Sequence, residues 1–178
     1  MIAATAAEDA ASIRDHAVIL LLSVYGVRSG EVRRLRLDDV DWRRDRIRFV
    51  RSKSGREETA PLERTVGEAI TRYLREARPR CDSRVVFLTL RAPHRPLSAG
   101  GLHHVVRRHL PAEGVPARGR GPHGLRHACA RHLLGSGLSF KHVGDHLGHR
   151  SPDATRVYAK VDLPALRKVA FDDLGGLS

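Results

Sequence analysis

Residues 122–127 read Pro-His-Gly-Leu-Arg-His and lead into a predicted helix that extends to Leu134. His123 and Arg126 are three residues apart at the start of this helix, and that spacing places both side chains on one helix face. Gly135 and Gly137 end the helix. A histidine and an arginine at this spacing are common in proteins, so the stretch acquires meaning only together with other parts of the chain.

Two further segments carry residues suited to chemistry. In the stretch from Tyr25 to Val32, Arg28 lies between a predicted buried helix and a short second helix. Leu147-Gly148-His149 is followed, nine residues after the histidine, by Tyr158. Each of these segments is a weak signal when taken alone.

Hydrophobic periodicity and turn residues predict a mostly helical α+β domain with a small three-stranded antiparallel sheet. Helices are expected at 11–25, from 29, and at 62–77, 102–110, 123–134, 140–147, 151–158 and 164–171. Strands are expected at 46–50, 57–61 and 85–88, with a glycine- and proline-rich loop at 111–122. In the first strand Ile47 and Phe49 alternate with Arg46 and Arg48, which predicts one buried and one exposed face.

The composition excludes several classes of protein. The chain has 178 residues, of which 41% are hydrophobic, and this suffices for one domain with a core. Its longest apolar run, 17–24, is too short to cross a membrane, and the charged residues before it do not resemble a signal peptide. Two cysteines give no disulfide framework. We therefore expect a cytoplasmic protein without a membrane partner.

The net charge of +12 favours a polyanionic partner. Residues 28–56 hold eleven basic and five acidic residues, and residues 91–132 hold eight basic residues and one acidic residue. Arginine bias in the genome is the alternative explanation, because 28 of the 32 basic residues are arginines. Histidines cluster at His142, His146 and His149, but without an established metal-binding spacing. We expect neither a metal nor another cofactor.

Taken in order along the chain, these segments resemble the catalytic domain of the tyrosine recombinase (phage integrase) family. That family carries an arginine in a Gly-hydrophobic-Arg-x-x-Glu segment, a lysine in a β-hairpin, His-x-x-Arg, Leu-Gly-His and a following tyrosine. The matching residues here are Arg28, Lys53, His123, Arg126, His149 and Tyr158. The resemblance covers residues 14–161, and it implies the corresponding catalytic-domain fold.

The resemblance implies metal-independent cleavage and rejoining of double-stranded DNA through a 3′-phosphotyrosyl intermediate. Arginine forks and a histidine donor suit a phosphate that gains negative charge, a role for Arg28, Arg126 and His149. Tyr158 would be the nucleophile and His123 its general base. Lys53 would protonate the leaving 5′-hydroxyl.

Neighbouring residues receive other roles. Tyr25 and Tyr73 lie on apolar helix faces and are expected to pack in the core. Glu31 is expected to support Arg28 through an ion pair, and His127 to pack or to support the site rather than to react. The hairpin turn departs from the usual Gly-Lys-Gly of the family, because it reads Ser-Lys-Ser-Gly at 52–55.

The resemblance also implies a bacterial protein associated with the nucleoid, and it sets expectations for organisation. Residues 1–178 would form the catalytic domain alone, without the amino-terminal helical domain that helps family members to clamp DNA. Residues 163–178 would be a tail that docks on a neighbouring copy or packs on its own domain, and the working unit would be a tetramer on paired sites. Two alternatives remain open: a non-catalytic DNA-binding remnant of a mobile-element integrase, and a type IB topoisomerase-like enzyme that nicks and reseals DNA.

Overall fold

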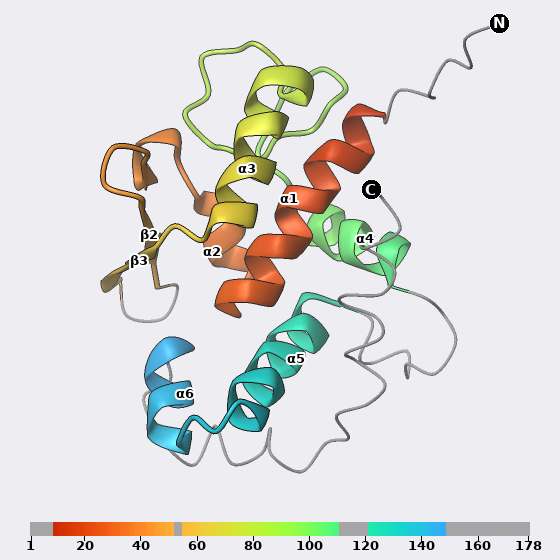
Figure 1. Cartoon of the computed structure of the whole chain (residues 1–178). Helices are drawn as coiled ribbons and strands as arrows, with labels where there is room; N and C mark the ends of the chain where they lie inside the picture. The colour runs from red at the N-terminus through yellow and green to blue at the C-terminus, as the bar shows by residue number, and fades with distance from the viewer. Residues whose placement is uncertain (1–8, 52–54, 111–120, 149–178) are drawn as a thin grey trace, which may run out of the picture.

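The computed structural model describes residues 9–51, 55–110 and 121–148. The helices are α1 (Ala10–Tyr25), α2 (Ser29–Arg34), α3 (Arg64–Arg72), α4 (Ala99–His109), α5 (Pro122–Gly135) and α6 (Phe140–His146), with a 3₁₀ turn at Leu37–Asp39 and a π-helical turn at Tyr73–Ala77. Helix α1 lies at the centre, and α3, α4 and α5 pack against it (Figure 1). The helices expected at 151–158 and 164–171 lie outside the described residues, as does most of the loop expected at 111–122.

Helix α1 is the core element that the apolar run predicts. Its amino-terminal end is capped by Asp9, whose side chain accepts a hydrogen bond from the Ser12 amide at 2.6 Å. Leu21 and Leu22 are fully buried. The helix ends at Gly26, whose φ of 55° lies in the left-handed region that favours glycine.

The sheet has three antiparallel strands in the order β1 (Val40–Asp41), β2 (Arg46–Val50) and β3 (Glu57–Pro61). Ile47 and Phe49 are buried in β2, as the alternation predicts. Beyond the strands, the Arg51 amide donates to the carbonyl of Arg56 at 2.8 Å, and the Gly55 amide donates to the carbonyl of Arg51 at 2.9 Å. These bonds join Arg51 to Gly55 and Arg56, the described residues on the far side of 52–54.

The strand expected at 85–88 is wrong as a member of the sheet. This segment forms only isolated bridges, and the third strand is β1 instead. Two of its amides bond to groups outside the sheet. Val86 donates to the carbonyl of Leu35, and Leu88 donates to the hydroxyl of Tyr73. The segment is apolar because it fills the core, where Phe87 stacks on Tyr73 with 5.4 Å between ring centroids.

Two helix starts differ from expectation because capping side chains decide them. The helix expected from residue 62 begins at Arg64, because the Glu63 carboxylate accepts the Thr65 amide at 2.8 Å. The helix expected from residue 102 begins at Ala99, because the Ser98 hydroxyl accepts the Gly101 amide at 2.9 Å.

Helices α5 and α6 pack together around a small apolar cluster of their own. The cluster consists of Cys129, Ala130, Val143 and Leu147. The architecture is that of the expected α+β class, with six helices and one small antiparallel sheet among the described residues. Within the same residues no helix is long and apolar enough to cross a membrane.

Candidate active site

Arg126, in the first turns of α5, connects the ends of two other helices. Its side chain is buried, with Nη1 donating to the carbonyl of Gly26 and Nη2 donating to the carbonyl of Leu147 at 2.6 Å. Gly26 is the C-cap of α1 and Leu147 is the C-cap of α6. Carbonyl groups at helix carboxyl ends carry partial negative charge, which suits a guanidinium.

Arg28 lies two residues beyond the carbonyl that Arg126 binds. Its backbone amide donates to Glu31 Oε2 at 2.9 Å, and its Nη1 donates to Glu31 Oε1 at 3.2 Å. The Arg28 side chain remains 29% exposed, while that of Glu31 is fully buried. The ion pair expected between Arg28 and Glu31 is confirmed, and it leaves a partly exposed guanidinium at the junction between α1 and α2.

Gly26 brings this junction close to the α5–α6 pair. A side chain at Gly26 would collide with Leu147 Cδ2, and its Cβ would lie 3.1 Å from Cys129 Sγ. Glycine is therefore required both by the left-handed backbone and by the close approach of α6. The structure thus brings the Arg126 guanidinium to the carbonyl two residues before Arg28, at the junction between α1 and α2.

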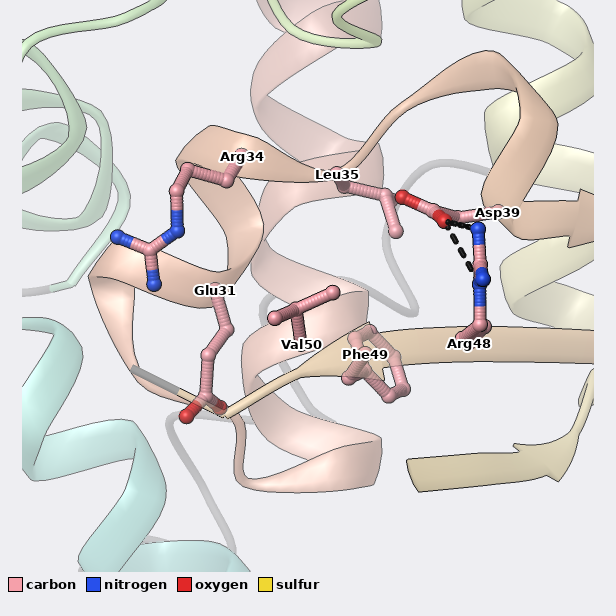
Figure 2. Close-up of a pocket in the computed structure, with 7 residues that line it drawn as sticks. All are labelled: Glu31, Arg34, Leu35, Asp39, Arg48, Phe49 and Val50. Atoms are coloured by element: carbon pink, nitrogen blue, oxygen red, sulfur yellow. Dashed lines mark hydrogen bonds and ion pairs between the residues drawn. The ribbon is translucent and has the colours of Figure 1, made fainter. Parts of the chain in front are cut away.

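Glu31 also marks where α2 meets the sheet. In a small pocket beside β2, the carboxylate of Glu31 points toward the end of the strand, and the Arg48–Asp39 ion pair lies on the other side of Phe49 and Val50 (Figure 2). The Glu31 carboxylate, which pairs with Arg28, is therefore directed away from the ion pair between Arg48 and Asp39.

His123 lies on the exposed side of α5 and contacts a second histidine. Its Nε2 is 2.7 Å from Nε2 of His127, and the two rings meet edge to face. Burial lowers the pKa of His127 to about 4, with further lowering by His123, Arg131 and Arg126. His127 is consequently neutral near pH 7, and a hydrogen bond across this pair needs one ring to donate and the other to accept.

Three of the six predicted site residues lie outside the described residues: Lys53, His149 and Tyr158. Lys53 belongs to the three residues that join Arg51 to Gly55, and His149 directly follows Gly148. The structure therefore describes the neighbours of Lys53 and His149 in the chain, and of the six residues it describes Arg28, His123 and Arg126.

The other two tyrosines are core residues, as predicted. The Tyr25 hydroxyl donates to the carbonyl of Pro61 at 2.9 Å and accepts the Glu63 amide at 2.8 Å. Tyr73 is fully buried, and its hydroxyl accepts the Leu88 amide. Burial raises the pKa of both phenols, which disfavours either one as a nucleophile.

The sequence model of the phage integrase family matches residues 1–163. The chain belongs to this family. Its sequence is 44% identical over 173 residues to y4gC of Sinorhizobium fredii, named as a candidate integrase/recombinase, and the match covers 97% of this chain and 89% of y4gC. It is 34% identical over 163 residues to tyrosine recombinase XerD of Mycobacterium tuberculosis, covering 89% of this chain and 51% of XerD. These matches place the chain in the class of tyrosine-type integrases and site-specific recombinases.

Solved structures of family members share the fold. The crystal structure of XerA recombinase superposes with a TM-score of 0.70 at 24% identity, covering 92% of this chain and 58% of XerA. The structure of XerH recombinase bound to its difH substrate before cleavage superposes with a TM-score of 0.70 at 22% identity, covering 92% of this chain and 47% of XerH. The expected tyrosine recombinase catalytic-domain fold is confirmed. The chain spans about half the length of several of these relatives.

One buried residue of this integrase-family site was missed by sequence reasoning. Arg51, directly after β2, is only 5% exposed, and it donates to Glu31 Oε2 at 3.0 Å. A signal was present in the sequence: Arg51 follows Ile47 and Phe49 at the same two-residue interval, so it continues their inward-facing series. Arginine at an inward position requires buried acceptors.

The described residues contain no group of three or more histidine, cysteine or acidic side chains able to hold a metal ion. Cys129 is buried, its Sγ donates to the carbonyl of Val24 at 3.4 Å, and burial raises the pKa of its thiol to about 12. A thiol with so high a pKa is neither a good nucleophile nor a good metal ligand near pH 7.

Proposed function

We propose that this chain cleaves and rejoins double-stranded DNA at specific sites, with Tyr158 as the nucleophile. The observation that carries the proposal is the hydrogen bond from Arg126 to the carbonyl of Gly26, two residues before Arg28, in a chain of the phage integrase family. Two arginines at one helix junction suit a phosphodiester that gains negative charge as it is attacked.

The cleavage step balances without a cofactor. The phenolic oxygen of Tyr158 attacks phosphorus and loses its proton to His123, while the bond from phosphorus to the 5′-oxygen breaks. Lys53 gives a proton to that oxygen, which leaves as a 5′-hydroxyl. Arg28 and Arg126 hold the non-bridging phosphate oxygens together with His149.

The rejoining step is the same chemistry in reverse. A 5′-hydroxyl from another strand loses its proton and attacks the 3′-phosphotyrosyl bond, and the tyrosine leaves as a phenol. Because one phosphoester is exchanged for another, the step needs no external energy source. The difference between recombination and simple resealing lies only in which strand supplies the hydroxyl.

The neutral His127 supports the assignment of His123 as the base. A neutral neighbour does not repel a proton that arrives on His123, whereas a charged one would. Half-burial and the 2.7 Å contact place His127 behind His123 on the same helix face. His127 thus supports the base without contacting the reacting atoms.

We extend the proposal to organisation. Residues 1–178 act as the catalytic domain, and residues 163–178 dock on a neighbouring copy in a tetramer on paired sites. Removing the residues after Asp162 would then reduce assembly on DNA and leave the affinity of one copy largely unchanged. Native gel mobility with one-site and two-site DNA measures both properties, and unchanged assembly would reject the docking role.

Covalent trapping tests the reaction. Nicked duplexes drawn from both genomic flanks of the gene are mixed with protein, quenched in detergent and resolved beside Tyr158→Phe. A protein–DNA band that persists in EDTA and disappears in Tyr158→Phe is expected. A band that survives the substitution, or salt-sensitive binding without any covalent product, would contradict the assignment. Relaxed supercoiled plasmid without recombinants would instead indicate a topoisomerase-like reaction.

A further inference from the structure

Arg51 follows β2 directly, and its side chain is almost completely buried, with 6% of its surface exposed. An arginine remains charged inside a protein, so its burial is costly unless fixed acceptors surround it. The identity of those acceptors indicates what the residue does.

Three nitrogen atoms of Arg51 donate hydrogen bonds to three different elements. Nε donates to Glu58 Oε2 of β3 at 2.6 Å, and Nη1 donates to Glu31 Oε2 of α2 at 3.0 Å. Nη2 donates to the carbonyl of His146, the last residue of α6, at 3.2 Å. One guanidinium therefore connects the hairpin, α2 and α6.

Gly148, the residue before His149, lies against the same guanidinium. Its φ is 63°, and a Cβ at this position would be 2.7 Å from Arg51 Nε and 2.9 Å from Arg51 Cζ. Only glycine fits this backbone at this distance. The Arg51 side chain thus packs directly on the chain that leads to His149.

Glu31 is shared between Arg51 and Arg28. Its Oε2 accepts both Arg51 Nη1 and the Arg28 amide, and its Oε1 accepts Arg28 Nη1. The carboxylate is fully buried, so it attracts neighbouring cations strongly. Loss of the Arg51 charge would increase the pull of Glu31 on Arg28 and draw the Arg28 side chain away from a bound phosphate.

We propose that Arg51 is a positioning residue for DNA cleavage. It fixes Glu31, and through it Arg28, relative to the last turn of α6, from which the chain continues to His149. The three nitrogen atoms of Arg51 donate to acceptors on three elements, so Arg51 links these elements to one another. This inference rests on the proposed function, since the orientation of Arg28 controls a rate only if Arg28 binds the scissile phosphate.

The first test compares Arg51→Gln with Arg48→Gln. Arg48 of β2 is a matched control close by in the chain, because it pairs with Asp39 at 2.7 Å and with Glu57 at 3.0 Å, and neither of these is a proposed site residue. We expect Arg51→Gln to slow single-turnover cleavage about 100-fold, with little change in the Kd for DNA. Arg48→Gln should change the rate by less than about threefold. Equal rates in the two variants would overturn the proposal.

The second test asks whether Arg51 acts through Arg28. The rate losses of Arg28→Ala and Arg51→Gln should not multiply, and the double variant should cleave at least about tenfold faster than the product of the single losses implies. A lysine at position 51 keeps the charge but not the three-way fork, so Arg51→Lys should recover part of the rate. Fully multiplicative losses would reject a role through Arg28.

A third measurement needs no cleavage. The amides of Leu147 and Gly148 donate to the carbonyls of Val143 and Asp145, and their hydrogen exchange should accelerate in Arg51→Gln but not in Arg48→Gln. A wild-type chain that never captures DNA would reject the proposed function, whereas unchanged exchange in Arg51→Gln would reject the inference on Arg51.

If Arg51→Gln does not fold, Glu58→Gln replaces it in all three measurements. Glu58 is 35% exposed, so its substitution weakens one anchor of Arg51 without leaving a buried charge unpaired. We expect a smaller loss in cleavage rate, about tenfold. A Glu58→Gln rate equal to that of wild type, together with unchanged exchange in α6, would count against the proposal.

Discussion

The body of the molecule (α1–α4 with the sheet) and the α5–α6 pair are held together by different forces. Among the described residues the main apolar cluster contains 25 buried side chains, nearly all from the body, whereas the α5–α6 cluster contains four. Figure 1 shows α6 at the lower edge of the molecule, beyond α5 and away from α3 and α4. Apolar burial alone therefore anchors α6 much less than it anchors the body.

Arginines supply the missing attachment of α6. Arg126 binds the carbonyl of Leu147, and Arg51 binds that of His146, so two consecutive carbonyls at the end of α6 each accept a guanidinium. In the body, the buried apolar residues are not among the proposed site residues. At the end of α6, Arg126 and Arg51 both hold the helix and have proposed roles in cleavage, so their substitution should affect rate and local stability together.

Arg126→Met should have the largest effect. It removes a proposed phosphate ligand, for which we expect a loss of about 1,000-fold in cleavage rate. It also leaves the carbonyls of Gly26 and Leu147 without this donor, at a cost of about 1–3 kcal/mol for each. Trapping kinetics and hydrogen exchange across α6 measure the two losses. Normal exchange in α6 with slow cleavage would show that Arg126 is a phosphate ligand only, and not an anchor of α6.

Leu22→Ala should lower the stability of the body without changing the chemistry of the site. Leu22 is fully buried in α1, and its truncation is expected to cost about 2–5 kcal/mol of unfolding free energy. Urea denaturation measures the loss. The folded fraction, examined at low temperature, should cleave DNA at the wild-type rate per folded molecule. If the cleavage rate falls by more than the unfolded fraction accounts for, core packing and chemistry are coupled in the body as well.

Gly148→Ala tests the close packing of α6 on Arg51. A left-handed alanine costs about 1–2 kcal/mol at any site, and here its Cβ would also lie 2.7 Å from Arg51 Nε. Gly137→Ala is the matched control, because Gly137 has a φ of 88° but nothing within 4 Å of an added Cβ. Both variants should lower the thermal midpoint, but only Gly148→Ala should slow cleavage. Equal cleavage rates would refute the packing argument.

Local sequence patterns predicted those structural features that depend on residues close together in the chain. The apolar run predicted α1, alternation predicted the buried face of β2, and the order of the motifs pointed to Arg28 and Arg126 as site residues. The same patterns could not predict β1, because two residues are too few for a periodicity. They also could not predict that Arg126 binds the carbonyl of Gly26, a hundred positions away in the chain. Such contacts arise from the packing of helices, which local periodicity does not encode.

The smallest expected effect is the pH dependence contributed by His127. Because burial lowers its pKa to about 4 in the folded chain, the unfolded chain binds more protons between pH 6.5 and pH 4. Stability should therefore fall as the pH is lowered through this window. For a half-buried ring screened by solvent, the contribution is about 1 kcal/mol. Urea midpoints at pH 7 and pH 5 measure it.

His127→Gln, which keeps a polar side chain without a titrating ring, should flatten this pH dependence by the same amount. The substitution also bears on the comparison between the two regions. His127 faces His123, Arg126 and Arg131 within the α5–α6 pair, so acid should loosen this pair before it unfolds the body. Hydrogen exchange at pH 5 should then rise in α5 and α6 ahead of α1. Simultaneous loss of protection in α1 would mean that the two regions unfold as one unit despite their different anchors.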